Sequence, residues 1–131
     1  MLNQYSRAEL LYGSDNMELL RGCRVAVFGI GGVGGSAVEA LARMGIGTLD
    51  LIDNDRVCLT NLNRQIFATR STIGKYKVDA ARERIADLDP EITVNTWPTF
   101  FLPENAAQFD FRQFDYVDKI RQVGVNPAFL C

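Results

Sequence analysis

The stretch from Arg24 to Ser36 is the feature that most constrains how this chain folds. A short apolar run, residues 24–28, leads into a glycine-rich segment, and an apolar stripe at helical spacing follows at Val33, Ala37, Ala40, Leu41 and Met44. Both faces of the run are apolar, which is typical of a strand buried in a parallel sheet. Strand, glycine turn and helix together form an arrangement that holds a phosphate group at the amino end of the helix.

The glycine spacing, Gly29-x-Gly31-x-x-Gly34, matches the dinucleotide-binding fingerprint. Gly29 permits the tight turn, Gly31 lets a phosphate approach the backbone, and Gly34 lets the helix sit close to the strand. A second apolar run, residues 48–52, is followed by Asp53, which lies 19 residues after Gly34. A ribose-binding carboxylate is expected after roughly 20 residues. We therefore predict a nucleotide site here, the alternative being that Asp53 only ends a strand.

The rest of the pattern predicts an α/β fold. A helix is predicted before Pro90, with its apolar face at Val78, Ala81, Ile85 and Leu88, and further strands over residues 92–98 and 115–117. Strands that alternate with helices at this spacing favour a Rossmann-like, doubly wound and mainly parallel sheet. We expect the sheet to be incomplete in its C-terminal half, which leaves an open strand edge.

Composition excludes several classes of function. The chain has no histidine, which excludes imidazole bases, Ser-His-Asp or Cys-His triads and His-ligated metals. The net charge of −2 gives no overall sign of nucleic-acid binding. No apolar run is long enough to span a membrane, and the charged residues among the first twenty argue against a signal peptide. Three cysteines without a C-x-x-C pattern indicate a reducing compartment, so we expect a cytoplasmic protein.

Several motifs in a fixed order, spanning residues 5–117, resemble the ThiF/MoeB family of adenylyltransferases. They are Gly29-Ile-Gly-Gly-Val-Gly34, Asp53-x-Asp55, Asn61-Leu-Asn-Arg-Gln65 and Gly74-Lys75. Three further stretches are similar to the branch of tRNA threonylcarbamoyladenosine dehydratases: Tyr5-Ser-Arg7, Gly45-Ile-Gly47 and Val57-Cys-Leu-Thr-Asn61.

The resemblance implies ATP and Mg²⁺ as cofactors and a homodimer as the assembly. It implies a role for each matched position: Gly29, Gly31, Gly32 and Gly34 would hold the phosphates, Asp53 with Asp55 would bind the nucleoside, and Asn61, Arg64, Gln65 and Lys75 would surround the phosphates. Arg64 and Lys75 would be catalytic, because cations stabilise the charge that develops on pyrophosphate. Arg7 would complete the catalytic set by reaching into the partner protomer's site.

The implied reaction is ATP-dependent adenylation of the carboxylate of the threonylcarbamoyl group on tRNA adenosine 37. Intramolecular attack on the acyl-adenylate would then release AMP and leave a cyclic base. A carboxylate with a pKa of about 4 is ionised at neutral pH, so it needs no general base and no histidine.

Three alternatives stay open. One is adenylation of the C-terminus of a sulfur-carrier protein, with that carrier or a cysteine desulfurase as partner. Another is an NAD-dependent oxidoreductase that uses the same glycine fingerprint. The third is a nucleotide-binding or dimerisation module without catalysis. The residues 61–65 with Lys75 favour adenylation over NAD chemistry, because NAD needs no such cationic ring.

The chain departs from the family pattern after Val117. The family continues this strand as Val-Val-Asp-Ala-x-Asp, with an aspartate that holds magnesium, whereas here Asp118-Lys119-Ile120-Arg121 follows. Asp118 would stand one residue early, and a shift of one residue turns a strand side chain to the opposite face. We therefore assign no metal ligand. We divide the chain into residues 1–117, the N-terminal part of an ATP-binding adenylation domain, and a divergent tail, residues 118–131. We expect a truncated, frameshifted or partial chain that is inactive as it stands.

Overall fold

The computed structural model describes residues 2–102 and 104–119. Its helices and strands follow in the order α1 (Ser6–Tyr12), α2 (Ser14–Arg21), β1 (Arg24–Phe28), α3 (Gly32–Met44), β2 (Thr48–Ile52), α4 (Lys77–Leu88), β3 (Thr93–Trp97) and β4 (Tyr116–Lys119). Short 3-10 turns occur at Leu59–Asn61, Ala106–Gln108 and Phe111–Gln113. None of the described helices is long and apolar enough to cross a membrane.

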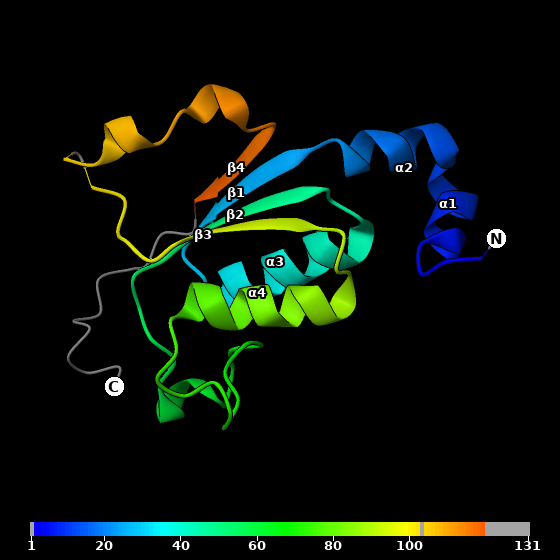
Figure 1. The fold of residues 1–131 in the computed structure, drawn as a ribbon. Coiled ribbons are helices and arrows are strands. Elements are labelled where there is room, and N and C mark those ends of the chain that lie inside the picture. The colour runs from blue at the N-terminus through cyan, green and yellow to red at the C-terminus, as the bar shows by residue number, and fades with distance from the viewer. Residues whose placement is uncertain (1, 103, 120–131) are drawn as a thin grey trace.

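The four strands form one parallel sheet in the order β3-β2-β1-β4 (Figure 1). This arrangement confirms the predicted α/β fold. The chain runs from β1 outward to β2 and β3, and then returns to place β4 on the other side of β1. The direction of winding therefore reverses at β1, and ligands of such sheets bind at the carboxyl ends of the strands beside this reversal.

One face of the sheet packs against α3 and α4 (Figure 1). The strand side chains Val27, Leu49 and Leu51 are completely buried there, together with Val38 of α3 and Ile85 of α4. The apolar face predicted for α4 is confirmed, with Val78, Ala81 and Ile85 buried. The stripe predicted for α3 is wrong: its buried residues are Gly34, Gly35, Val38 and Ala42, because two glycines form part of its packed face, and Val33 is 70% exposed.

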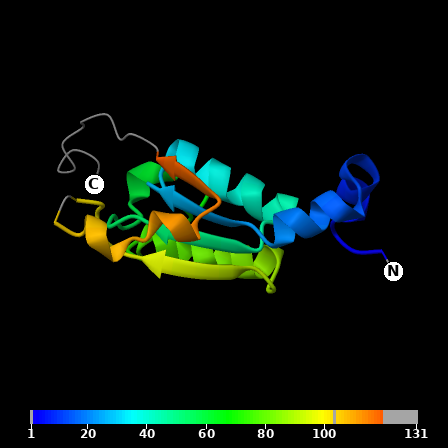
Figure 2. The same ribbon diagram turned by 90° about the horizontal axis from the view of Figure 1, so that it is seen from above.

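The opposite face is covered by an aromatic connection between β3 and β4 (Figure 2). Phe28 lies against Phe101 and Phe109, with ring centroids 5.1 and 5.6 Å apart, and Trp97 lies 5.1 Å from Phe109. Phe109 is buried, whereas Phe111 remains 43% exposed. Aromatic side chains take the place that a helix would occupy in a regular doubly wound sheet.

The amino-terminal helices α1 and α2 lie beyond the amino ends of the strands, away from the glycine loop (Figure 1). Tyr5 and Arg21 anchor them to Asp89, the residue that follows α4. The Tyr5 hydroxyl and Arg21 Nη1 both donate to Asp89 Oδ2, the latter over 3.1 Å. Tyr5 and Asp89 are both buried. Through this polar cluster, α1 and α2 are held to the residue that follows α4.

Candidate functional site

The glycine loop connects the carboxyl end of β1 to the amino end of α3. Gly29 has φ +95°, a left-handed conformation that favours glycine, and its N–H still donates to Ile52 O over 2.8 Å. The amide of Gly35 is bonded to Gly31 O over 2.8 Å. The amides at the start of α3 before Gly35 have no acceptor within the helix, and the helix dipole adds partial positive charge there. This end of α3 is therefore suited to bind a phosphate.

The segment after β2 folds back beside the glycine loop. A Cβ added at Gly31 would lie 3.7 Å from Gln65 Nε2, and one added at Gly35 would lie 3.4 Å from the ring of Phe67. At Gly32 a Cβ would meet no atom of residues 2–102 and 104–119 within 4 Å, so these residues leave the loop open on that side. The predicted residue Gln65 is thus placed beside the predicted phosphate loop.

Asp53 holds the glycine loop in place through hydrogen bonds, and we call it the brace of this loop. It is 5% exposed, its Oδ2 accepts from the Ile30 amide over 2.7 Å, and its Oδ1 accepts from the Asp55 amide over 2.8 Å. Burial raises the pKa of Asp53, and this outweighs the opposing effect of the two backbone hydrogen bonds. The carboxylate therefore ties the loop after β1 to the loop after β2, while its contact with ribose stays a prediction.

Lys77, which sequence reasoning missed, lies beside this brace. It is the first residue of α4 and is 5% exposed. Its Nζ lies 3.6 Å from Asp55 Oδ2, and its amide donates to Asp55 O over 2.9 Å. A buried ammonium group is costly unless it is paired, so this arrangement points to a specific role. The sequence held one signal for this residue: Lys77 directly precedes Val78, which lies on the predicted apolar face of the helix.

The other predicted cations are engaged with their own segments. Lys75 Nζ pairs with both carboxylate oxygens of Glu83 over 2.9 and 3.0 Å. Arg64 Nη1 donates to Thr60 O over 2.9 Å. Asn61 is buried, and its Oδ1 accepts from the Cys58 amide over 2.9 Å, which closes a 3-10 turn. The structure thus brings Gln65 to the glycine loop, while Lys75 is paired with Glu83 of α4 and Arg64 with the turn that precedes it.

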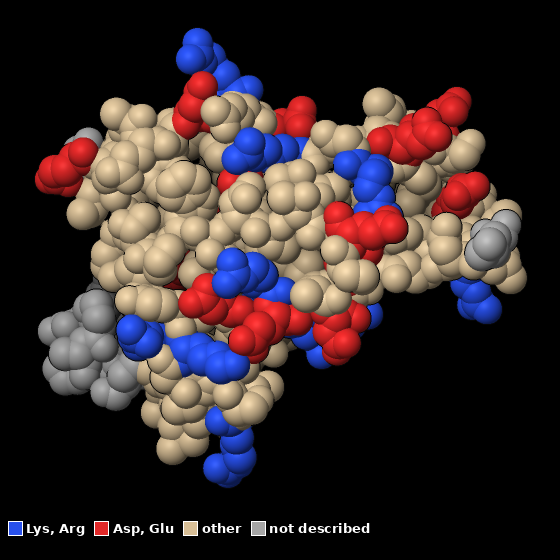
Figure 3. Space-filling model, in the orientation of Figure 1, with Lys and Arg blue, Asp and Glu red and all other residues tan. Residues whose placement is uncertain are grey.

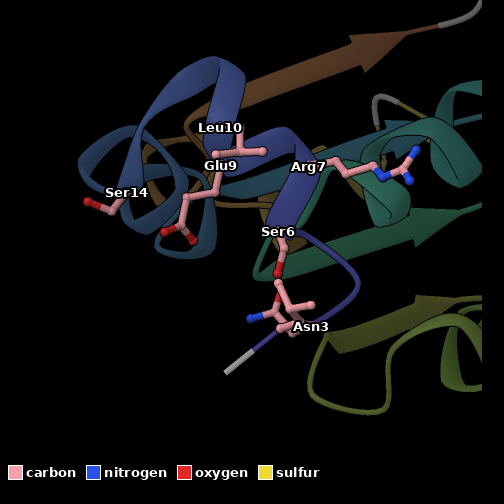
Figure 4. Close-up of a pocket in the computed structure, with 7 residues that line it drawn as sticks. Asn3, Ser6, Arg7, Glu9, Leu10 and Ser14 are labelled. Carbon is pink, nitrogen blue, oxygen red and sulfur yellow. The ribbon is translucent and has the colours of Figure 1, made fainter.

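Arg7 lies at the other end of the molecule from the glycine loop. It is an exposed residue of α1, and its side chain points away from Glu9 and Ser14, with which it lines a shallow pocket (Figure 4). Since α1 lies beyond the amino ends of the strands, Arg7 does not approach the nucleotide site of its own chain (Figure 1).

The described acidic residues do not form a magnesium site by themselves. Among residues 2–102 and 104–119 no group of three or more acidic or cysteine side chains could hold a metal ion. Both oxygens of Asp53 accept backbone hydrogen bonds, and Asp55 faces Lys77. The backbone of Asp118 pairs opposite Val27 in β4, but its side chain and the tail after residue 119 lie outside the described part of the chain.

Comparison with known proteins places these features in a family. The ThiF family pattern matches residues 5–119. The chain is 48% identical over 117 residues to the tRNA threonylcarbamoyladenosine dehydratase of Bacillus subtilis, covering 89% of this chain and 46% of that protein. It is 41% identical over 93 residues to the molybdopterin-synthase adenylyltransferase of Salmonella typhimurium, covering 70% of this chain and 37% of that protein.

A solved structure supports the same relation. The E. coli tRNA N6-threonylcarbamoyladenosine dehydratase in complex with ATP matches this chain with a TM-score of 0.88 and 41% identity, covering 92% of this chain and 49% of that one. This chain therefore spans about half the length of the dehydratases it matches.

Proposed function

Because the chain belongs to the ThiF family, we propose that it binds ATP at the glycine loop and forms the nucleotide-binding part of an enzyme that adenylates a carboxylate. The single observation that carries this proposal is the ion pair between the buried Lys77 and the partly exposed Asp55. The pair lies beside Asp53, the brace of the glycine loop. The ammonium group of Lys77 and the amino end of α3 therefore lie at the same edge of the sheet. A triphosphate has the charge that this arrangement suits.

Each group of the site has a task in this proposal. The free amides at the start of α3 bind the phosphates, while Lys77 stabilises the negative charge that grows on the departing pyrophosphate. The substrate carboxylate attacks the α-phosphorus as the bond to pyrophosphate breaks. Asp55 is the better candidate for the ribose hydroxyls, because within the described residues its Oδ1 accepts no hydrogen bond, whereas both oxygens of Asp53 do.

The substrate we propose is the threonylcarbamoyl group on tRNA adenosine 37, whose adenylated carboxylate then cyclises with loss of AMP. The support is the identity of 48% to a relative named for this dehydration. A sulfur-carrier protein is the second candidate, supported by the likeness to a molybdopterin-synthase adenylyltransferase. A location in the cytoplasm fits both substrates.

Magnesium belongs to the proposal as a partner of the ATP phosphates, whose charge it would neutralise. Mg²⁺ is usually held through one or two carboxylates plus phosphates, but the described acidic residues do not supply a site alone. No step of the proposed reaction is therefore assigned to it.

Titration calorimetry with ATP, adenosine and NAD tests nucleotide binding. Replacing Lys77 by Met removes a charge-assisted contact of about 1.5–3 kcal/mol, which corresponds to roughly 10- to 150-fold weaker ATP binding. Adenosine has no phosphates, so its affinity should hardly change. The matched control is Lys75→Met, because Lys75 pairs with Glu83 and should matter much less. Tighter binding of NAD than of ATP would refute the proposal.

We also propose that Arg7 acts in a homodimer, on the partner's nucleotide. Its distance from its own glycine loop supports this, since α1 lies at the opposite end of the strands. In a full-length relative, mixing protomers that carry the Arg7→Ala change with protomers that carry Lys77→Met should restore one intact site per heterodimer. A mixture no more active than its parents would show that Arg7 does not act across the dimer.

A further inference from the structure

The segment between β2 and α4, residues 54–77, differs in charge from the rest of the chain. It contains five of the 14 lysines and arginines but only one of the 16 acidic residues, Asp55. The segment is therefore strongly positive, whereas the whole chain has a net charge of −2. The net charge of the whole chain does not reveal this asymmetry, because acidic residues outnumber basic residues in the rest of the chain.

Most of this positive charge faces solvent. The exposed members form a surface that we call the basic rim: Arg56, Arg64, Arg70 and Lys75. The fifth basic residue, Lys77, is buried against Asp55. In Figure 3 the projection below α4, which this segment forms in Figure 1, shows Lys and Arg side chains, while the Asp and Glu side chains gather above it.

The rim is held in shape by its own hydrogen bonds. A turn closed by the Thr72 amide on Thr69 O, over 3.0 Å, presents Arg70 and Ser71 at its tip. The hydroxyls of Thr69 and Ser71 lie 3.1 Å apart beside Arg70. Within the described residues Arg70 has no hydrogen bond or ion pair of its own, so its guanidinium group is available to a ligand.

Arg56 is fixed in a different way. Its guanidinium group lies 4.1 Å from the centroid of the Tyr76 ring, and its Nη1 donates to Gly74 O over 2.8 Å. A cation stacked on an aromatic ring keeps further N–H groups for an outside acceptor. Binding at this position therefore loses little side-chain entropy.

The inner side of the same segment contacts the nucleotide site. Gln65 lies beside Gly31, and Phe67 packs against Gly35 at the start of α3. A polyanion bound along the rim would thus lie next to the glycine loop, where the proposed reaction takes place. Exposed guanidinium groups, with hydroxyls beside Arg70, suit a sugar–phosphate backbone, whereas the centre of a protein interface is usually depleted of charge.

We propose that the basic rim binds the sugar–phosphate backbone of an RNA and so brings a modified base to the ATP site. This inference rests on the proposed function for its choice of RNA, and it locates the contact that the reaction requires.

Fluorescence anisotropy with a labelled RNA hairpin, at several salt concentrations, tests the rim on this 131-residue chain. Because Lys75 pairs with Glu83, three guanidinium groups remain for phosphates, and log K should fall with log salt with a slope of about −2 to −3. Arg70→Gln should weaken binding roughly 3- to 10-fold and reduce the slope by about 1. Arg43→Gln is the matched control, because Arg43 is 56% exposed on α3 and its partner Glu39 keeps a second arginine, Arg84, at 2.7 Å.

Three results would overturn the inference. One is RNA binding by Arg70→Gln equal to that of the original chain, and another is an equal loss in the Arg43→Gln control. The third is displacement of the RNA by polyglutamate as effectively as by unlabelled RNA, which would indicate an acidic protein partner. ATP calorimetry on the same variants separates the two proposals: ATP binding should survive Arg70→Gln. Salt-dependent RNA binding without any ATP binding would refute the proposed function and leave the rim intact.

Discussion

Gly47 is the position at which a single added methyl group should do most damage. It lies between α3 and β2, where the chain passes under the end of α2. A Cβ built there would lie 1.7 Å from Arg21 O and 2.8 Å from the carbonyl carbon of Arg21. Both are backbone atoms, so no side-chain rotation can relieve the overlap. The Gly47→Ala variant must move either the end of α2 or the start of β2.

The cost follows from the hydrogen bonds at this crossing. Gly47 N donates to Leu20 O over 3.3 Å, Thr48 N to Cys23 O over 3.1 Å, and Thr93 N to Gly47 O over 3.0 Å. Each such bond contributes about 0.5–1.5 kcal/mol, and overpacking adds about 1–3 kcal/mol. We expect a loss of about 3–6 kcal/mol in the free energy of unfolding. That is a large share of the 5–15 kcal/mol typical of a domain.

Urea denaturation followed by circular dichroism measures this loss. The matched control is Gly22→Ala in the same region: Gly22 has φ −85°, and a Cβ there would be 3.5 Å from the nearest atom, Leu19 O, an ordinary contact. Its unfolding free energy should stay within about 1 kcal/mol, because a compatible Gly→Ala change mainly restricts the unfolded chain. A Gly47→Ala variant within 1 kcal/mol of the original chain would refute the reasoning.

Two further predictions concern buried carboxylates. Burial alone would raise the pKa of Asp89, but the hydrogen bonds from Tyr5 and from neighbouring donors outweigh burial and lower this pKa. The contribution of Asp89 to the free energy of unfolding is therefore present above the unfolded pKa of 3.8 and is lost as pH falls through the folded pKa. Asp89→Asn should therefore destabilise at pH 7 and have a smaller effect near pH 3, and a pH-independent effect in urea denaturation would contradict this. Asp50 is completely buried and pairs with Arg24 over 2.7 Å. Asp50→Leu alone should lower the free energy of unfolding by about 3 kcal/mol. Adding Arg24→Met should recover most of that loss, and a double variant as unstable as the sum of its singles would show that the pair is not the cause.

The main features of the fold could be predicted from local patterns. Residues 24–28 are apolar on both faces, and their strand is buried in a parallel sheet as expected. The helical periodicity after the glycine loop predicted the existence of α3 but not its buried face, which contains Val38 and Ala42, whereas the predicted stripe residue Val33 is 70% exposed. The predicted strand beginning at Asp115 corresponds to β4, which starts at Tyr116. Such patterns are reliable because they reflect burial of one face, which is repeated along each element.

The aromatic connection could not be predicted in the same way. It has no regular period, and its residues cover the sheet through pairs such as Phe28 with Phe101 and Trp97 with Phe109. Contacts between residues so distant in sequence depend on where the sheet places β3 and β1. Only the tertiary structure shows that these side chains substitute for a helix layer.

The candidate site also has a part that the sequence predicts and a part that only the tertiary structure decides. The glycine spacing and the acidic residue after β2 were readable from the sequence alone, because the backbone conformation of a phosphate loop demands glycine at fixed positions. Which lysine lies beside the glycine loop's buried Asp53 depended on direction in space: Lys75 pairs with Glu83, and Lys77, two residues later, is buried against Asp55. Both lysines stand at the start of the same helix, so sequence by itself determined that a cation stands there. Only packing decided which one is desolvated and paired, because burial depends on the neighbours that folding brings together.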